Sequence, residues 1–492
     1  MSNNSNLNIN HYKFFSIKID FLFFIKLFAI FSMISMYFTL IVPIDGEEGT
    51  YTISAMEMYL NGHYFDSTIY GNFYGRPPLL SWLIIGICKI IGFSHVLIAS
   101  RFVNATMVIL TGFVLFYLIN VVAKSKSFAW TTLACFYSEI ILMRLGWLAY
   151  SDCTLMFFTF LAIALLWLGV EKQKNRYFII ASLSLLCAFL TKAITPYYYY
   201  AAFGLVLLIR HENRMFLIRP ASFLVHILAL ILPFIFIYFA NPNYLFRMLS
   251  DAFDSGGGEL LSSLDKVPDY LYQALIFQPI QLIATTTPFS LIAIYAIIFK
   301  KEFKNYQYIE LAKIGFLTFF IAFIPFWFSW NHWPEGRYYL PVIPALSIWF
   351  AYFIYNANDK LKKITLCLLV ITLVIKLLLG GFGFYAFYKN FRPDYPLIAK
   401  DIIHIVKDAP LTVSRGGTAE GLGIASSLDE QFMPYKTVTD YTKKMPHGIS
   451  YFVYPSGNRN LPIKLERNQH LVKAYLHKYS PRSIFLIEQI NS

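Results

Sequence analysis

The sequence is dominated by long apolar runs that recur from Phe21 to Phe387. About 20 consecutive apolar residues suffice for a helix to cross the hydrocarbon core of a bilayer. Only 14% of the residues are charged, whereas soluble proteins carry about 25%. These runs predict an all-α polytopic membrane protein with about 11 to 13 transmembrane helices.

The predicted spans differ from a cleavable leader and from one shorter apolar segment. The first run is longer than a signal-peptide core of about 7 to 15 residues, so we expect it to remain as a span. The shorter segment Pro77–Gly92 contains Lys89, and if it crossed the membrane, Lys124 and Lys126 would face outside. The charge rule therefore favours a helix lying at the outer surface. The predicted spans are 21–42, 97–121, 127–146, 153–170, 177–191, 197–210, 220–240, 274–299, 309–330, 339–355 and 364–387.

The basic residues predict the orientation of these spans. Lys and Arg gather in alternate loops, for example at Arg210–Arg219 and Lys360–Lys363, and basic loops mark the cytoplasmic side. The N-terminus is therefore expected in the cytoplasm. The first long loop, 43–94, and the polar tail, 389–492, are then expected outside.

The tail predicts a second domain after the transmembrane domain, 1–388. It alternates β-rich runs with the amphipathic stretch Leu397–Val406, which is typical of a small α/β domain. Its glycine-rich segment Arg415–Gly423 has neither phosphate-loop spacing, so we predict an ordinary loop there.

The sequence indicates no metal site and no disulfide framework. The five cysteines form no CxxC pair. His63 and His332 lack paired-histidine or HExxH spacing, so we interpret them as loop residues. We therefore name no metal ligands and no cofactor, and leave open whether the protein depends on a divalent metal.

Charged residues gather at the predicted outer ends of the spans. The carboxylates are Asp45, Glu47 and Glu48 in "PIDGEEGTY" and Asp152 in "AYSDC"; the cations are Arg76 in "YGRPPLLSWL", Lys192 and Arg337. Carboxylates act as general bases, and Lys and Arg bind phosphate and stabilise a departing anion. The pattern predicts an extracytoplasmic site for an anionic substrate with a phosphate leaving group.

Each of these residues also has a structural interpretation. Asp45 is equally compatible with a solvated loop carboxylate, and Asp152 with an N-cap of a helix starting at Cys153. Arg76 and Lys192 are long enough to extend to lipid headgroups. Glu139 and Arg144 are placed to pair near one helix end.

The motifs resemble those of GT-C-type, polyprenyl-phosphate-dependent membrane glycosyltransferases. Within that class they are most similar to the bacterial aminoarabinose lipid A transferases and the protein O-mannosyltransferases. In chain order, the motifs are Glu47-Glu48 with Tyr51, Glu57-Met58 and Gly62; Arg76-Pro77-Pro78 with Leu79, Leu80 and Trp82; Arg101; Asp152; Thr191-Lys192; Pro268-Asp269-Tyr270; and Arg337-Tyr338-Tyr339-Leu340-Pro341.

The chain also departs from the family pattern. Arg76 replaces a lysine, and Glu47 stands where an aspartate is usual, with Asp45 two residues earlier. Thr50 replaces an arginine and Gly75 an acidic residue, and the loop 241–273 contains no histidine. The last two departures weaken both a metal site and the assignment to the aminoarabinose subgroup.

The resemblance implies an inverting transfer of a sugar, an aminosugar in the closest subgroup. The donor is a polyprenyl phosphate, expected to be undecaprenyl phosphate, and the acceptor is lipid A at the periplasmic face of the bacterial inner membrane. The resemblance gives catalytic roles to Glu47, Asp45, Asp152 and Glu48, and donor-phosphate binding to Arg76, Lys192, Arg337 and Tyr338. Tyr51, Tyr270 and Arg101 are further site candidates.

Other functions remain open. The acceptor is alternatively a protein or another envelope glycan. A lipid-linked sugar flippase is the non-enzymatic alternative, but such transporters are often built from inverted repeats, and no repeated motif is visible. The choice between Asp45 and Glu47, the sugar, the oligomeric state and the role of the tail domain are left undetermined.

Overall fold

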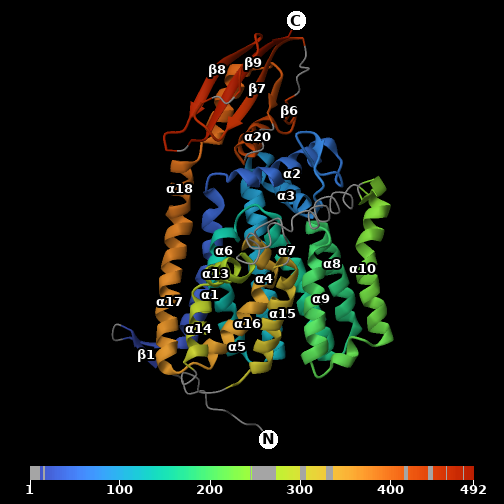
Figure 1. Cartoon of the computed structure of the whole chain (residues 1–492), viewed down its shortest axis with the longest axis vertical. Coiled ribbons are helices and arrows are strands. Elements are labelled where there is room, and N and C mark those ends of the chain that lie inside the picture. The colour runs from blue at the N-terminus through green and yellow to red at the C-terminus, as the bar shows by residue number, and fades with distance from the viewer. Residues whose placement is uncertain are drawn as a thin grey trace.

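A bundle of helices stands below a small sheet domain in the computed structural model of the chain (Figure 1). The structure describes residues 11–14, 17–243, 245–246, 273–299, 306–327, 336–414, 419–441, 447–460, 463–479 and 481–491. The first described residues, 11–14, and the C-terminal sheet domain lie at opposite ends of the molecule (Figure 1). The predicted combination of an apolar helical part and a C-terminal α/β domain is confirmed.

The bundle is built from helices that mostly follow the predicted apolar runs. Its main helices are α1 (Phe21–Ser35), α4 (Val96–Val122), α5 (Lys126–Ser138), α6 (Ile140–Leu145), α7 (Ser151–Lys172), α8 (Asn175–Lys192), α9 (Thr195–Arg210), α10 (Pro220–Ala240), α13 (Gln278–Thr285), α14 (Phe289–Ile298), α15 (Ile309–Trp327), α16 (Ile343–Tyr355), α17 (Asp359–Leu378) and α18 (Phe384–Phe391). Short helical turns extend some of them, namely η1 (Met36–Ile41), η3 (Phe93–His95), η4 (Arg214–Phe216), η6 (Gln273–Phe277), η8 (Gly336–Val342) and η9 (Leu379–Gly383). A short hairpin, β1 (His11–Phe14) and β2 (Ile17–Asp20), precedes α1.

Within the described residues, six helices are long and apolar enough to cross a membrane: Phe21–Ile41, Phe93–Val122, Ser151–Lys172, Pro220–Ala240, Arg337–Tyr355 and Asp359–Phe391. A seventh crossing results if Leu275–Thr285 and Phe289–Ile298, bent by 112°, form one span. This is fewer than the eleven predicted spans. The other predicted spans coincide with α5 and α6, α8, α9 and α15, which are not in this group.

The predicted span 127–146 is interrupted at Glu139. Its extended backbone (ψ 129°) separates α5 from α6. Glu139 is buried, and neither carboxylate oxygen has a hydrogen-bond partner within the part of the chain that is described. The charge that it faces is Lys376 of α17, not Arg144, so the predicted pairing with Arg144 is wrong.

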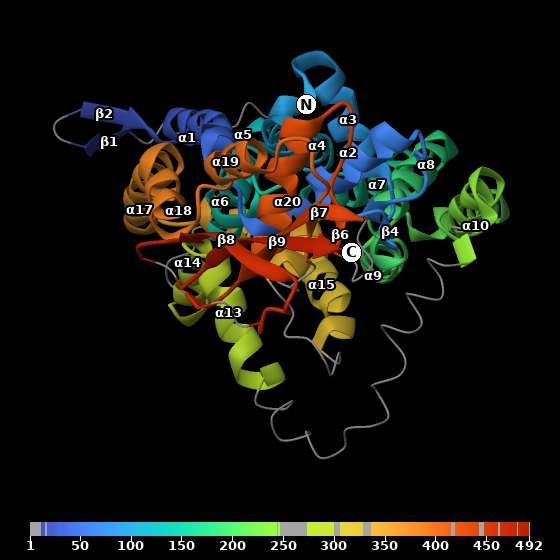
Figure 2. The same cartoon turned by 90° about the horizontal axis from the view of Figure 1, so that it is seen from above.

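The first loop covers the end of the bundle nearest the sheet domain (Figures 1 and 2). It contains the turn η2 (Gly46–Glu48), α2 (Gly49–Asn61), the hairpin β3 (Thr68–Ile69) and β4 (Asn72–Phe73), and α3 (Leu79–Ile91). As predicted for Pro77–Gly92, α3 is a short apolar helix and falls outside the six long spans.

The C-terminal domain combines α19 (Tyr395–Val406) and α20 (Ala419–Phe432) with a sheet of order β6-β5-β7-β9-β8. Strand β5 (Leu411–Val413) runs parallel to β6 (Thr439–Asp440) and β7 (Gly448–Ser456). Strand β9 (Ser483–Asn491) runs antiparallel to β7 and to β8 (Gln469–Leu476).

The predicted loop Arg415–Gly423 is partly wrong. Residues 419–423 form the first turns of α20, while residues 415–418 lie outside the described chain. The glycine serves close packing here: a Cβ at Gly423 would lie 2.8 Å from the ring of Tyr395. Glycine therefore marks a helix-packing contact rather than a turn.

The sheet domain and the first loop share one hydrophobic core. Ile44, Ile53 and Ile69 of the loop are buried in the same cluster as Ile424 and Leu486 of the domain. Helices α2 and α20 also touch through a 2.6 Å hydrogen bond between the hydroxyls of Thr52 and Ser426. The domain therefore holds the first loop against the bundle.

We predict that Gly49→Ala separates these two parts. A Cβ at Gly49 would overlap the carbonyl of Leu422 in α20, and overpacking of this kind costs about 2 kcal/mol. Thermal unfolding in detergent should show a lower midpoint, and limited proteolysis should release the C-terminal domain earlier. Gly86→Ala in α3 is the matched control, because nothing lies within 4 Å of its added Cβ. Equal midpoints for the two variants would contradict a shared core.

Candidate active site

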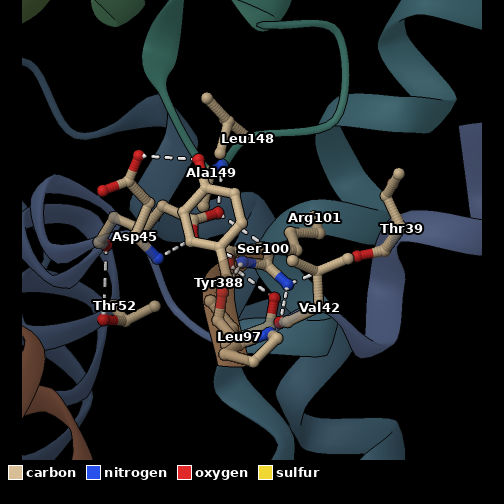
Figure 3. A network of polar contacts seen from close by, with 12 residues as sticks. Thr39, Val42, Asp45, Thr52, Leu97, Ser100, Arg101, Leu148, Ala149 and Tyr388 are labelled. Carbon is tan, nitrogen blue, oxygen red and sulfur yellow. Dashed lines mark hydrogen bonds and ion pairs between the residues drawn. The ribbon is translucent and has the colours of Figure 1, made fainter. Parts of the chain in front are cut away.

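A buried ion pair between Glu48 and Arg101 anchors the first loop to the bundle. Figure 3 shows Arg101 in this network, near Thr39 and Val42. Both side chains of the pair are fully buried, and Nη2 of Arg101 lies 2.5 Å from Oε2 of Glu48. Arg101 Nε donates to Glu48 Oε1 at 2.8 Å, and the backbone N–H of Ala149 donates to the same oxygen at 2.9 Å. Arg101 also donates to the carbonyls of Thr39 and Val42.

The hydrogen-bonding groups of this pair are all used within the protein, so none is left to bind a substrate. The second Glu48 oxygen also accepts from the backbone N–H of Asp45 at 2.8 Å, and the guanidinium of Arg101 lies 4.9 Å from the ring centre of Trp147. The predicted catalytic role of Glu48 does not fit this burial. The geometry supports a structural role for Glu48 and Arg101: they fix the turn that carries Asp45 and Glu47.

Asp45 connects the first loop to the start of the C-terminal domain. Its Oδ1 lies 2.7 Å from Arg392 Nη2, and its Oδ2 accepts from the Tyr388 hydroxyl at 3.1 Å. The Asp45 side chain is only 17% exposed. The interpretation of Asp45 as a solvated loop carboxylate is therefore wrong.

Glu47 is the accessible carboxylate of the turn. Its side chain is 55% exposed, and its Oε2 lies 3.6 Å from Arg337 Nη1. Arg337 is held 5.9 Å from the ring centre of Tyr150. Glu47 and Arg337, far apart in sequence, thus face each other.

Asp152 and Lys192 form a second acid–base contact on neighbouring helices. Lys192 Nζ donates to Asp152 Oδ1 at 2.7 Å, and the two side chains are 12% and 3% exposed. The Lys192 ammonium also lies 4.4 Å from the ring centre of Tyr338. Because α7 begins at Ser151 with Tyr150 as its N-cap residue, the N-cap interpretation of Asp152 is wrong.

Arg76 lies on the exposed connection between the hairpin and α3. Its Nε donates to the Tyr74 hydroxyl at 3.2 Å, and it interacts electrostatically with Tyr51 and Tyr338. The Tyr51 hydroxyl lies 3.1 Å from that of Ser151 at the start of α7. The predicted basic residue before the prolines therefore faces Tyr338, as Lys192 does.

A buried glutamate, Glu57, positions the segment that carries Arg76. Its two oxygens accept from the backbone N–H of Gly71 at 3.2 Å each. Burial raises the pKa of Glu57, and hydrogen bonds from Thr68 and Gly71 work against that rise. Gly71 turns the hairpin with φ of +75°, and the returning strand leads through Tyr74 to Arg76.

The structure brings most of the predicted site together. Arg76 interacts with Tyr51 and Tyr338, and Lys192 lies at the same Tyr338. Glu47 contacts the neighbouring Arg337. Tyr270 and His332 lie outside the described residues. Among the described residues, no group of three or more His, Cys, Asp or Glu side chains is arranged to hold a metal ion.

Sequence analysis missed three residues that support this set. Arg392 and Tyr388 hold Asp45, and Tyr150 lies beside both Arg337 and Tyr51, whose ring centre is 6.4 Å away. The first two belong to the junction with the tail domain. No local pattern signals their contact with Asp45, which is more than 300 residues earlier in the chain.

Comparison with known proteins gives a family match over about a third of the chain. Residues 75–239 match the family model described as dolichyl-phosphate-mannose-protein mannosyltransferase. Among curated proteins, no sequence matches the chain. The predicted resemblance to GT-C-type glycosyltransferases, and with it the predicted class of enzyme, is confirmed at the level of this family domain and of the fold.

Two solved structures show the fold. The chain is similar to ArnT from Cupriavidus metallidurans bound to undecaprenyl phosphate, with a TM-score of 0.59, 13% identity and coverage of 94% of this chain and 97% of that one. It is also similar to an Archaeoglobus fulgidus oligosaccharyltransferase, with a TM-score of 0.52 and 14% identity. That match covers 82% of this chain and 61% of the oligosaccharyltransferase.

We predict unequal stability effects for two neighbouring glutamates. Glu48→Gln leaves the buried Arg101 charge without its counter-ion and should destabilise the protein by about 3 kcal/mol. Glu47→Gln, the matched control, removes only an exposed and solvent-screened contact and should leave the unfolding midpoint within about 1 °C of the parent. Equal loss of thermal stability in the two variants would contradict the assigned roles.

Proposed function

We propose that this protein transfers an aminosugar from undecaprenyl phosphate to lipid A, at the periplasmic face of a bacterial inner membrane and with inversion at the anomeric carbon. The observation that carries the proposal is that Arg76 and Lys192 both face Tyr338, while Arg337, the residue before it, faces the exposed Glu47. ArnT, which shares the fold, was crystallised with undecaprenyl phosphate, and this supports the choice of carrier.

The cations bind the phosphate that the reaction releases. The acceptor oxygen forms a bond to the anomeric carbon while the bond from that carbon to the phosphate oxygen breaks. The electron pair of the broken bond stays on the polyprenyl phosphate, whose added negative charge faces Arg76, Lys192 and Arg337. Charge-assisted contacts of this kind strengthen as the charge develops, which lowers the barrier.

The three carboxylates have different roles in the proposed reaction. Glu47 is the carboxylate that a substrate can reach, so it orients the acceptor and takes its proton when the acceptor is a hydroxyl. Asp152 fixes the Lys192 ammonium at 2.7 Å. Asp45, bound by Arg392 and Tyr388, positions the turn in front of Glu47.

A second acceptor class is supported by the family match, whose description names protein mannosyltransferases. A Ser or Thr hydroxyl needs a general base, and such a base contributes about 10²- to 10⁴-fold to the rate. A lipid A phosphate is already ionised at neutral pH and needs almost none. The effect of Glu47→Gln on the transfer rate therefore separates the two acceptors.

We predict that lipid A from cells with the active gene carries an added aminosugar mass that is absent from deletion cells. Arg76→Ala should abolish the addition, since loss of one donor to a developing anion costs about 10²- to 10³-fold in rate. Arg76→Lys, the matched control, keeps the charge and should retain measurable transfer. The measurement is mass spectrometry of extracted lipid A.

Unchanged lipid A in cells that contain the protein would contradict the proposed acceptor. Glycoproteins from the same cells then provide the next measurement. Loss of a protein glycan in both the deletion and the Arg76→Ala cells would establish the second acceptor class.

A further inference from the structure

A cavity of about 570 Å³ lies beside Tyr388 and Arg392, the two residues that hold Asp45. Its walls come from the end of η1 and the following residues (Leu40–Ile44), the start of α4, the connection from α18 to α19, and α20. None of Arg76, Lys192 and Arg337 lines it. The proposed reaction therefore does not use this cavity.

The cavity borders the lipid-facing surface of the bundle. It lies between the ends of two helices that are long and apolar enough to cross a membrane, Phe21–Ile41 and Asp359–Phe391. Ile41 on its wall is 67% exposed, and Phe387 and Phe391 on α18 are 54% and 47% exposed. Exposed apolar residues on membrane helices contact acyl chains, so an occupant reaches this cavity from the bilayer.

The polar part of the cavity is basic. Lys389 is exposed, with its ammonium 5.6 Å from the ring centre of Tyr385, and Arg392 and His477 also line the wall. Of the two acidic residues, Asp394 is used as the N-cap of α19. Burial raises the pKa of Glu430 to about 8, so this carboxyl is mostly neutral at pH 7.

Arg392 joins the cavity to the first loop. One guanidinium nitrogen holds Asp45 at 2.7 Å. The other, Nη1, is buried and has no hydrogen-bond partner among the described residues. Arg392 also lines the cavity, so an acceptor bound there lies beside the guanidinium that holds Asp45.

We propose that this cavity binds the headgroup of an anionic bilayer phospholipid. The phosphate lies between Lys389 and Arg392, and the acyl chains leave along Leu97 and Ile98 towards the exposed face of α18. The site combines a cationic rim with an apolar wall at the membrane surface, which suits an anionic lipid better than a water-soluble anion. Because Arg392 also holds Asp45, an occupied cavity acts on the position of the first loop.

The test is native mass spectrometry of the purified full-length protein titrated with phosphatidylglycerol, with phosphatidylcholine of the same chains as the comparison lipid. Basic residues near a membrane surface contribute about 1 kcal/mol each, so Lys389→Gln should weaken phosphatidylglycerol binding about fivefold. Lys400→Gln is the matched control, because Lys400 is an exposed lysine of the same domain that does not line the cavity. Ile98→Trp should also reduce binding, by filling the apolar wall without changing charge.

Several results would overturn the proposal. Equal phosphatidylglycerol affinity in Lys389→Gln and Lys400→Gln would do so, as would equal affinity for the two phospholipids. Displacement of phosphatidylglycerol by undecaprenyl phosphate would assign the cavity to the sugar donor instead. Within the described part of the chain, Arg392 and Tyr388 hold the Asp45 carboxylate and Lys389 does not. Because binding is also measured without turnover, failure of the proposed transferase function would leave this test valid.

Discussion

The buried ion pair of Glu48 and Arg101 is the interaction on which the arrangement of the site depends. It joins the turn of the first loop to α4, and through Thr39, Val42 and Ala149 it also joins the end of η1 and the segment before α7. A buried pair of this kind is stable only when its remaining hydrogen-bonding groups are satisfied. Here both oxygens of Glu48 accept two hydrogen bonds or more each, so the turn has one well-defined position.

That position gives three neighbouring carboxylates three different environments. Glu48 points into the protein, Asp45 points to the C-terminal junction, and Glu47 stays 55% exposed towards Arg337. The C-terminal domain takes part in this division, because it supplies Arg392 and shares a hydrophobic core with the first loop. The domain is therefore part of the active-site scaffold.

Elements that depend on a local pattern are well predicted from the sequence. Contacts that depend on tertiary packing are poorly predicted. Apolar length predicted α1, α4, α7, α10 and α17, and the charge pattern predicted a short surface helix at Pro77–Gly92, observed as α3. The cations and carboxylates of the site were visible as motifs. The partners of these residues were not visible in the sequence, because the contact between Asp45 and Arg392 depends on the packing of the tail domain on the loop. For the same reason, burial separates Glu48 from Glu47 although the two are adjacent in the chain.

The central claim is that Arg76, Lys192 and Arg337 together bind the phosphate of a polyprenyl donor. The most direct measurement is an experimental structure of the protein with undecaprenyl phosphate bound. The account predicts phosphate oxygens within about 3 Å of the Arg76 guanidinium and of at least one of the other two cations, with Glu47 facing the same space. A phosphate bound in the cavity beside Lys389 and Arg392, or away from Arg76 altogether, would contradict it.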